Sequence, residues 1–447
     1  MPSGVLPLWR FLITDLAGSG ITSLDHLASD RTVTPRLNEA SEVTGTVPSN
    51  SDYVNRLHTD GSPALSEGVR QLYCFRRESD TPPYYTIRAS TLVMQINDAA
   101  ASDDARSRFT AWDPWQYLMS RPVLQSANAT GGNYTTGNLI RSAGLIYGAA
   151  QTASFIVKDM IATTQAASLS GPTAARNCFI DATVASVGTF GTFVGGYTIQ
   201  QGTSLGQALQ EMCATGIMDI LFNPIYDSTR PGILCEVVLM SQSSPDLGAG
   251  SFQYNAVFGW DRPRRSAVGM DDLFDGVGRA NHIQFYAGQG GSPVAVQVSA
   301  ASVAKYGEYW AQQFFPAENI TAPVITLAIQ QLGLRQNGKQ TLTVNPASGR
   351  APEPFFDYYL GDRVPVYASN RLRQPLPLGT DPVWQRVYGI PVDIDDNSVE
   401  TVRELIVGPV DGPVIGPPPA APRANPINPK VAITTARNTN RQGGVGP

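Results

Sequence analysis

The hydrophobic positions of this chain alternate with polar ones, at a period of two residues, over several separate stretches. The clearest examples lie near its end, between Asp357 and Pro409, where Tyr359–Tyr367 and Val399–Val407 both alternate. A period of two is typical of half-buried strands, whereas a helix repeats every 3.6 residues. Gly-Asp and Asp-Asp-Asn-Ser supply turn residues between the strands. We therefore predict a small antiparallel barrel or sheet here, without a catalytic cluster.

The first 125 residues show the same strand pattern, divided by Ser, Asp, Gly and Pro breaks. The expected strands are Trp9–Thr14, Val43–Val47, Arg70–Arg76 and Tyr84–Ile96. Asp113 is a natural N-cap and Pro114 a natural first helical residue. These two residues predict a short helix that runs to Arg121 before Pro122 stops it.

Residues 126–250 mix both periods and predict a small α/β insertion. We expect helices over Leu139–Ala150 and Ala153–Thr164, and a further helix after Ser204. In that last helix one face is apolar. Strands are expected on either side of it, at Ile217–Phe222 and Ile233–Met240. The apolar face of that helix consists of Leu205, Ala208, Leu209 and Met212.

From 251 to 408 the strand pattern returns and predicts a second β domain, interrupted by one helix over Pro323–Leu332. The remaining residues, 409–447, are rich in Pro, Ala and Asn and cannot build a core, so we expect this arm to be disordered alone. The predicted class is α+β and β-rich, with domains at 1–125, 126–250 and 251–408 and a Pro-rich arm at 409–447.

Composition supports a turn-rich β protein with a polar surface. The 447 residues include 42 Gly and 34 Pro, only 15% are charged, and the net charge is −5. A mildly acidic chain does not attract DNA or an anionic membrane, although nucleic acid can pass it without sticking. The first 18 residues lack the basic start of a signal peptide, and no stretch reaches the roughly 20 apolar residues of a membrane span.

The cysteines and histidines do not suggest a metal or redox site. The four cysteines are irregularly spaced, form no C-x-x-C motif and are typical of free thiols in a reducing cytoplasm. Only three histidines could complete a metal site. These residues are Cys74, Cys178, Cys213, Cys235, His26, His58 and His282.

Three motifs resemble functional sites, and each has a simpler explanation. Gly202–Gly206 matches the G-x-S-x-G nucleophile elbow, with Ser204 as nucleophile and Asp261 and His282 as possible partners. No oxyanion segment and no hydrolase βα rhythm accompany it. Thr203 or Ser204 as the cap of the following helix explains the same residues.

The second motif, Gly333–Gln340, differs by one residue from a phosphate-binding loop. Its Mg²⁺-binding Ser/Thr position is Gln340, with Thr341 displaced by one, and a helix precedes it where a strand is needed. A helix end at Gly333 and a turn at Asn337-Gly338 into the strand Thr341–Val344 account for it.

The third motif follows the spacing of an EF-hand. Asp393, Asp395, Asn397 and Glu404 occupy its positions 1, 3, 5 and 12, but Ser398 stands where the sharp turn needs Gly. Strand-like flanks favour a hairpin turn. No catalytic, cofactor or metal site is therefore expected, and no cofactor.

Four stretches, in order, resemble the tail hub proteins of tailed bacteriophages, and most of all the minor tail proteins of actinophages. The first three are Arg36–Ser41, Phe109–Pro122 and Gly202–Leu209, and the last is a set of three: Ser302–Gly307, Tyr359–Val364 and Arg386–Ile390. Together they span residues 36 to about 407, in the order that the family has. The Pro-rich arm has no counterpart in the family pattern.

The resemblance implies a structural virion protein at the tail tip, made in the host bacterial cytoplasm. It implies a homotrimeric ring with two small antiparallel barrels per chain, so that six barrels continue a six-fold tail tube. The implied partners are further copies of the chain, the distal tail protein, the tape measure protein and the tail tube or other tail-tip proteins. DNA would meet it only in transit during ejection, and no bond would be made or broken.

Two other functions remain open. The chain could bind carbohydrate on the host surface, since its 6 Trp and 17 Tyr allow stacking on sugar rings, although burial is the default for aromatics in strands. It could also be a serine hydrolase of the tail tip that acts through Ser204.

Overall fold

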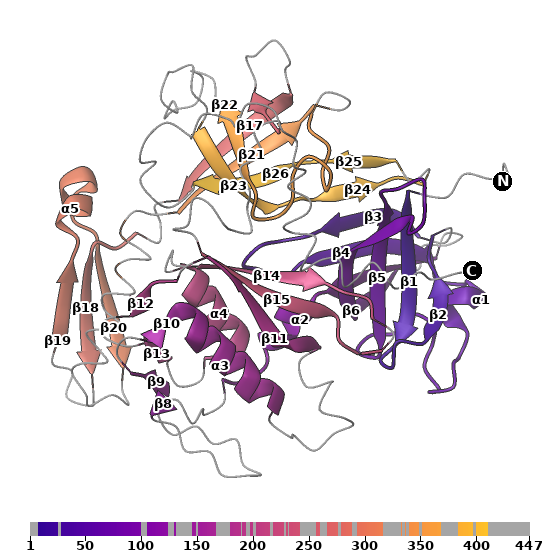
Figure 1. Cartoon of the computed structure of the whole chain (residues 1–447), viewed down its shortest axis with the longest axis horizontal. Helices are drawn as coiled ribbons and strands as arrows, with labels where there is room; N and C mark the ends of the chain where they lie inside the picture. The colour runs from indigo at the N-terminus through magenta and orange to yellow at the C-terminus, as the bar shows by residue number, and fades with distance from the viewer. Residues whose placement is uncertain are drawn as a thin grey trace.

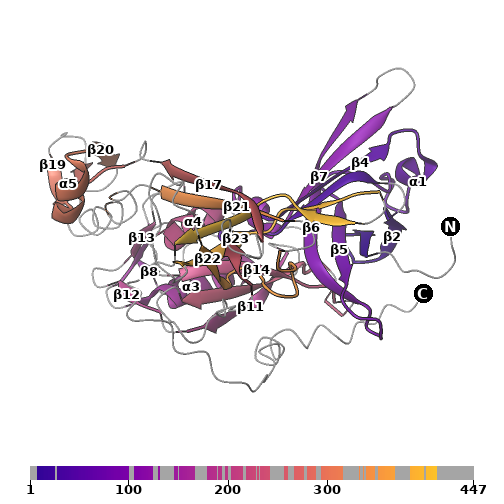
Figure 2. The same cartoon turned by 90° about the horizontal axis from the view of Figure 1, so that it is seen from above.

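A computed structural model of the chain is rich in β-sheet and has few helices (Figures 1 and 2). It describes residues 8–409 except 26–27, 100–104, 124–128, 131–144, 149–150, 167–178, 189, 194–196, 200–202, 215–217, 228, 231, 242–255, 260–265, 276–278, 288–292, 316–331, 333–335, 337–338, 348–350, 368–382 and 397–398. Within that part of the chain, no helix is both long and apolar enough to cross a membrane.

The largest sheet has nine strands and contains every strand predicted in the first 125 residues. Its order is β2-β1-β5-β6-β7-β4-β3-β24-β25, and all neighbours are antiparallel. The short helix α1 (Asp52–Asn55) connects two of its strands. The strands are β1 (Trp9–Asp15), β2 (Gly20–Ser23), β3 (Ser29–Thr34), β4 (Glu42–Pro48), β5 (Arg70–Arg77), β6 (Tyr85–Ala99), β7 (Arg106–Trp112), β24 (Val392–Ile394) and β25 (Glu400–Val402).

The two ends of this sheet approach each other, so that it forms a nearly closed barrel. Trp9 on β1 donates its indole N–H to Glu400 on β25, over 3.0 Å. Arg76 on β5 binds the same carboxylate, with 2.9 Å from Nε to Oε2. A hairpin from the end of the chain therefore completes a barrel that the first residues begin.

A second, six-stranded sheet has the order β16-β22-β23-β26-β21-β17 and is antiparallel except for β16 and β22. It shares one hydrophobic core with the first sheet, since Trp9, Phe109, Val344 and Val407 belong to a single buried cluster. The strands are β16 (Phe258–Gly259), β17 (Ala267–Asp275), β21 (Lys339–Pro346), β22 (Arg363–Tyr367), β23 (Val383–Gly389) and β26 (Leu405–Pro409).

This topology corrects the expectation that Asp357–Pro409 forms one sheet. Strands β22, β23 and β26 stay in the six-stranded sheet, but hairpin β24–β25 leaves it and pairs with β3. Alternation identifies a strand and its buried face, yet it carries no information on which edge the strand will pair with.

The middle of the chain packs small sheets and three helices around a separate core (Figure 1). Strands β11 (Ile180–Val187) and β14 (Met218–Pro224) flank β15 (Cys235–Ser241), the former parallel to it and the latter antiparallel. The smaller elements are β8 (Ala129–Thr130), β9 (Leu145–Tyr147), β10 (Gln151–Thr152), β12 (Thr192–Phe193), β13 (Tyr197–Ile199), α2 (Pro114–Leu118), α3 (Ala153–Ala166) and α4 (Leu205–Ala214).

Most local predictions in this region are confirmed. Asp113 caps α2 and Pro114 is its first residue, although the helix ends at Leu118 rather than Arg121. The predicted apolar face of α4 is fully buried. The helix expected over Leu139–Ala150 is wrong where the structure describes it, because Leu145–Tyr147 is strand β9, which pairs with β8 and β13.

A third β unit lies at the end of the molecule opposite to helix α1 (Figures 1 and 2). It consists of β19 (Pro293–Val298), β18 (His282–Ala287) and β20 (Trp310–Phe315), in that order across the sheet, and of helix α5 (Ala300–Tyr306). Ser299 caps α5 by accepting the N–H of Ser302. The helix expected at Pro323–Leu332 lies outside the described residues except for Leu332.

Candidate functional site

The structure explains the nucleophile-elbow motif as a helix cap. The Ser204 hydroxyl accepts the N–H of Gln207 over 3.1 Å, and the Gln207 side chain accepts the N–H of Ser204 over 3.1 Å. This reciprocal pair is a capping box. His282 lies in a different sheet, where its ring stacks on Trp310, and Asp261 lies outside the described residues. Ser204 therefore has a structural role at the start of α4.

The phosphate-loop motif leads into a strand. Lys339 begins β21, so the described part has the reversed order that the sequence predicted. Gly333, Asn337 and Gly338 lie outside the described residues.

The EF-hand motif forms a hairpin turn. The N–H of Asp395 donates to Val399 O over 3.1 Å, and the N–H of Val399 donates to Asp395 Oδ1 over 2.7 Å. Asp393 is already engaged, since Arg403 Nε donates to its Oδ2 over 2.8 Å. Asn397 and Ser398 are not among the described residues.

The described cysteines are buried thiols. Cys74, Cys213 and Cys235 are free, and burial raises the pKa of each thiol well above its usual value. Cys178 and His26 lie outside the described residues. Over the residues that the structure describes, no group of three or more His, Cys, Asp and Glu could hold a metal ion.

Several buried polar side chains meet at the junction of the nine-stranded sheet, the middle region and the six-stranded sheet. Asn38 lies at its centre with a left-handed backbone, at φ +65°. Its side chain accepts the N–H of Ile220 and donates to Asp219 Oδ1, both over 2.7 Å. On the other side, Leu37 donates its N–H to Tyr388 O over 2.8 Å. One short segment thus binds both neighbouring regions.

A buried ion pair crosses the same junction. Arg386 on β23 and Asp219 on β14 are 1% and 0% exposed, and Nη1 lies 2.9 Å from Oδ2. These two atoms are close but not aligned as a hydrogen bond, so the contact is an ion pair held by charge. Desolvation of two charges costs several kcal/mol, about as much as their attraction returns. The pair therefore contributes more to the relative placement of the two strands than to net stability.

Asp113 joins this junction to helix α2. Its carboxylate is 2% exposed and accepts the N–H of Ser41 over 2.9 Å and the N–H of Trp115 over 3.0 Å. Burial raises the pKa of Asp113 to about 7, against the two N–H bonds, which lower it. A carboxyl that caps a helix and also binds a loop fixes the angle between them.

Helix α2 in turn contacts the start of α4. Leu205 donates its N–H to Arg121 O over 2.7 Å, and Pro122 forms an isolated bridge with Ser204. Gly206 allows this approach, because a Cβ there would lie 2.8 Å from the Met119 nitrogen. The two helices can pack this closely only without a side chain at that position.

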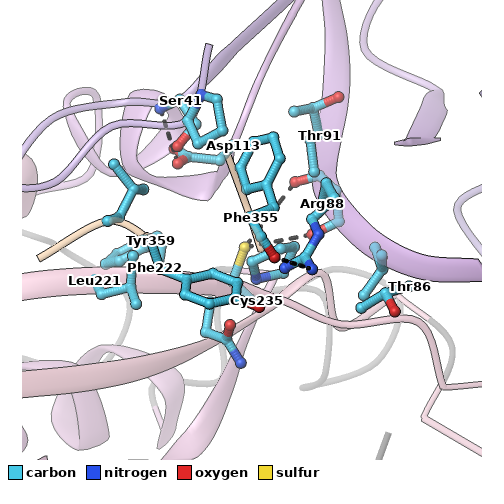
Figure 3. Close-up of a pocket in the computed structure, with 17 residues that line it drawn as sticks. Ser41, Thr86, Arg88, Thr91, Asp113, Leu221, Phe222, Cys235, Phe355 and Tyr359 are labelled. Carbon is cyan, nitrogen blue, oxygen red and sulfur yellow. Dashed lines mark hydrogen bonds between the residues drawn. The ribbon is translucent and has the colours of Figure 1, made fainter. Parts of the chain in front are cut away.

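A cavity of about 100 Å³ lies in the junction and is mostly apolar (Figure 3). Strand β6 lines it through Thr86–Thr91, β14 through Leu221–Pro224, and the segment before β22 through Phe355 and Tyr359. The Arg88 guanidinium stacks on both of these rings, with 5.0 Å and 5.3 Å to their centroids. All three regions of the chain contribute walls.

The sequence analysis did not predict that this junction would form, although it had singled out most of the stretches that build it. Asn38, Asp113 and Arg386 all lie in stretches that resemble tail hub proteins. Asp219 was counted only as part of a strand, Ile217–Phe222. A single acid inside a strand that is otherwise apolar was the available signal, since a buried carboxylate needs a partner.

Over about nine tenths of its length the chain is similar to solved structures of tail proteins. The match with a tail protein from Neisseria meningitidis MC58 covers 90% of this chain and 96% of that protein, at 13% identity and a TM-score of 0.46. The match with prophage tail protein gp18 from Listeria monocytogenes EGD-e covers 89% of this chain and 94% of that protein, at 10% identity and a TM-score of 0.44. The match with the 43 kDa tail protein of prophage MuSo2 from Shewanella oneidensis covers 90% of this chain and 99% of that protein, at 11% identity and a TM-score of 0.46.

No protein-family model matches the chain, and no curated protein matches it by sequence.

Proposed function

We propose that this chain is a structural subunit of the central hub at the tip of a bacteriophage tail. The observation that carries the proposal is that most of the hub-like sequence stretches meet at one junction, whereas Ser302–Gly307 forms part of α5 in the third β unit. Arg36–Ser41, Phe109–Pro122, Gly202–Leu209 and Arg386–Ile390 are far apart in sequence, yet their described residues bind one another there. Sequence stretches that only formed separate local strands would not need to contact one another in the folded chain.

In this proposal the chain has a barrel domain at 1–125, an inserted α/β domain at 126–250, a second barrel domain at 251–408 and an arm at 409–447. Three copies close into a ring through heterologous contacts, so that six barrels face a six-fold tail tube. The fixed junction keeps the two barrels of each chain at the spacing that the tube requires. The exchange of hairpin β24–β25 couples them further.

The proposed hub is a conduit and not an enzyme. DNA passes it during ejection, and the net charge of −5 disfavours adhesion to the phosphate backbone. Its proposed partners are the distal tail protein, the tape measure protein and the tail tube. The capping bond of Ser204 supports this proposal over the hydrolase alternative, because it gives that hydroxyl a structural role.

Mass photometry of the purified chain tests this proposal. A hub gives a particle of three 47.9 kDa subunits, about 144 kDa, that persists on dilution or forms with the tail-tube or distal tail ring. A chain that stays monomeric at high concentration, with and without those rings, contradicts it.

A further inference from the structure

The three-stranded sheet β19-β18-β20 has one face packed inward and one whose edge strands β19 and β20 are exposed, while His282 at its centre is only 8% exposed. On β18, Ile283 and Phe285 are fully buried. Side chains alternate between the two faces along a strand, so His282 and Gln284 lie on the other face. That face is the subject here, and we call it the outward face.

Tyr286 continues this face along β18, and strand pairing places six residues with described side chains at and around His282 and Gln284; we restrict the term outward face to these six. His282 is paired with Val298 on one side and with Trp310 on the other, and Gln284 is paired with Val296 and with Gln312. Paired residues point to the same side of a sheet. The outward face is therefore two rows of three residues: Val298, His282 and Trp310, then Val296, Gln284 and Gln312.

Its chemistry is unusual for a surface exposed to water. Trp310 is 58% exposed, and Val296 and Val298 are each 47% exposed. None of the six described residues is Asp, Glu, Lys or Arg, and the polar positions are two amides and an imidazole. An exposed face that gathers aromatic and aliphatic side chains without charge indicates binding.

The indole of Trp310 is held as a platform. Its ring stacks on His282, with centroids 4.4 Å apart and an interplanar angle of 26°, so one side is supported and 58% of the residue is still exposed. Its Nε1 donates to Glu308 Oε2 over 3.3 Å. A large aromatic ring that is fixed before binding loses little entropy when a ligand stacks on it.

The turn before Trp310 is also held in place, by the fully buried Asn281. Its Oδ1 accepts the N–H of Tyr309 over 2.8 Å, and its Nδ2 donates to Gly307 O over 2.7 Å. His282 Nδ1 lies 3.2 Å from the same Oδ1. Asn281 therefore contacts His282, on which the Trp310 ring stacks, and also fixes the backbone that leads into Trp310.

The size of the outward face favours a small ligand over a protein. Three strands about 4.8 Å apart, each with two residues of this face about 6.6 Å apart along the strand, give roughly 190 Å². A stable protein contact buries about 800 Å² on each partner. A face of this size matches a few sugar rings.

We propose that the outward face binds a neutral glycan, with a pyranose ring stacked on Trp310. The apolar side of a pyranose packs on the indole, while Gln284 and Gln312 can each donate to and accept from ring hydroxyls. The absence of cations among the six residues, and Glu308 beside Trp310, disfavour uronic, sialic and phosphorylated sugars. This activity is separate from the hub function and does not require a trimer.

The test is calorimetric titration of the whole chain with soluble neutral hexasaccharides made of glucose, mannose, galactose or N-acetylglucosamine. We expect saturable binding of at least one of them. Trp310→Ala should weaken it at least about tenfold, because stacking and apolar burial are lost, and Trp310→Phe should retain part of it. Gln312→Ala should weaken it several-fold, and a uronic acid hexamer should bind more weakly than its neutral counterpart.

Tyr53→Ala is the matched control. Tyr53 is 69% exposed on α1, at the far end of the molecule, and its loss should leave binding unchanged. The proposal is overturned if no hexasaccharide binds at up to about 10 mM, or if Trp310→Ala binds as the wild type does. It is also overturned if sugars do not bind and Trp310→Ala instead shifts the mass distribution, since the face is then a contact between copies. Sugar binding by a chain that proves monomeric would contradict the hub and leave this proposal intact.

Discussion

The junction and the outward face of sheet β19-β18-β20 differ in which side chains they expose to water. The junction buries charge, with Asp219, Arg386 and Asp113 all at 2% exposure or less. The outward face leaves Trp310 exposed and carries no Asp, Glu, Lys or Arg among its six described residues. Buried charge restricts the arrangement of neighbouring elements, because only one geometry satisfies it. An open aromatic face leaves its contacts to a partner.

The largest effect is expected at the buried ion pair. Arg386→Met leaves the Asp219 charge without its cation and should lower the free energy of unfolding by about 3–5 kcal/mol. Urea denaturation measures the change. Arg403→Met is the control, since Arg403 pairs with Asp393 while its side chain is 71% exposed, and such a pair contributes about 1 kcal/mol or less.

The double variant Arg386→Met with Asp219→Leu separates charge from packing. It should recover much of the loss, because both charges are then removed together. If Arg386→Met and Arg403→Met have equal effects, the junction does not depend on buried charge.

Asp113 should make stability depend on pH. Its pKa, raised to about 7 in the folded chain, lies above the value near 4 that the unfolded chain has. Between these pH values the folded state binds more protons, so the free energy of unfolding should fall as the pH rises from about 4 to about 7. The loss is at most about 4 kcal/mol.

Asp113→Asn removes the titrating group and keeps an oxygen for the cap. Urea midpoints of the wild type and the variant, measured across that pH range, should therefore differ in slope. Parallel profiles would show that the carboxyl stays ionised, with the N–H bonds from Ser41 and Trp115 outweighing burial.

The hairpin that closes the first barrel should depend on Glu400. Glu400→Gln weakens the contacts with Arg76 and Trp9 and should cost about 1–3 kcal/mol, as for hydrogen bonds to charged groups. Glu67→Gln makes the same chemical change at an exposed position and should lie within about 0.5 kcal/mol of the wild type. Hydrogen exchange of β24 and β25 should be faster in Glu400→Gln. Unchanged exchange would mean that pairing with β3 is sufficient.

The smallest effect is expected on the outward face. Trp310→Ala should lower the free energy of unfolding by about 1 kcal/mol or less, as for surface substitutions. Trp115→Ala, at 1% exposure, should cost about 3–5 kcal/mol. Thermal unfolding of both variants gives the comparison. A large loss in Trp310→Ala would mean that the exposed indole is a part of the fold and not a binding surface.

The local structure was largely predictable from the sequence because local chemistry determines it. Asp113 and Pro114 predicted the start of α2, and the spacing of Leu205, Ala208, Leu209 and Met212 predicted the buried face of α4. The capping alternative at Ser204 and the hairpin at Asp395 were also confirmed. In each case the deciding interactions lie within a few residues.

The long-range arrangement was not predictable in the same way. Residues 145–147 read as part of a helix but pair as a strand with β8 and β13. Hairpin β24–β25 has the pattern of its neighbours, yet its partner is β3, more than 350 residues earlier. Likewise Asp219 and Arg386 meet only because two sheets are brought together. A single sequence shows where each strand lies and which face it buries, but it does not show which other strand it will pair with.

An averaged electron-microscopy image of the purified chain, viewed along its symmetry axis, tests the hub most directly. The proposed hub predicts a closed three-fold ring with six similar densities around a central channel, two for each chain. Isolated single subunits, or an open chain of subunits without a channel, would contradict it.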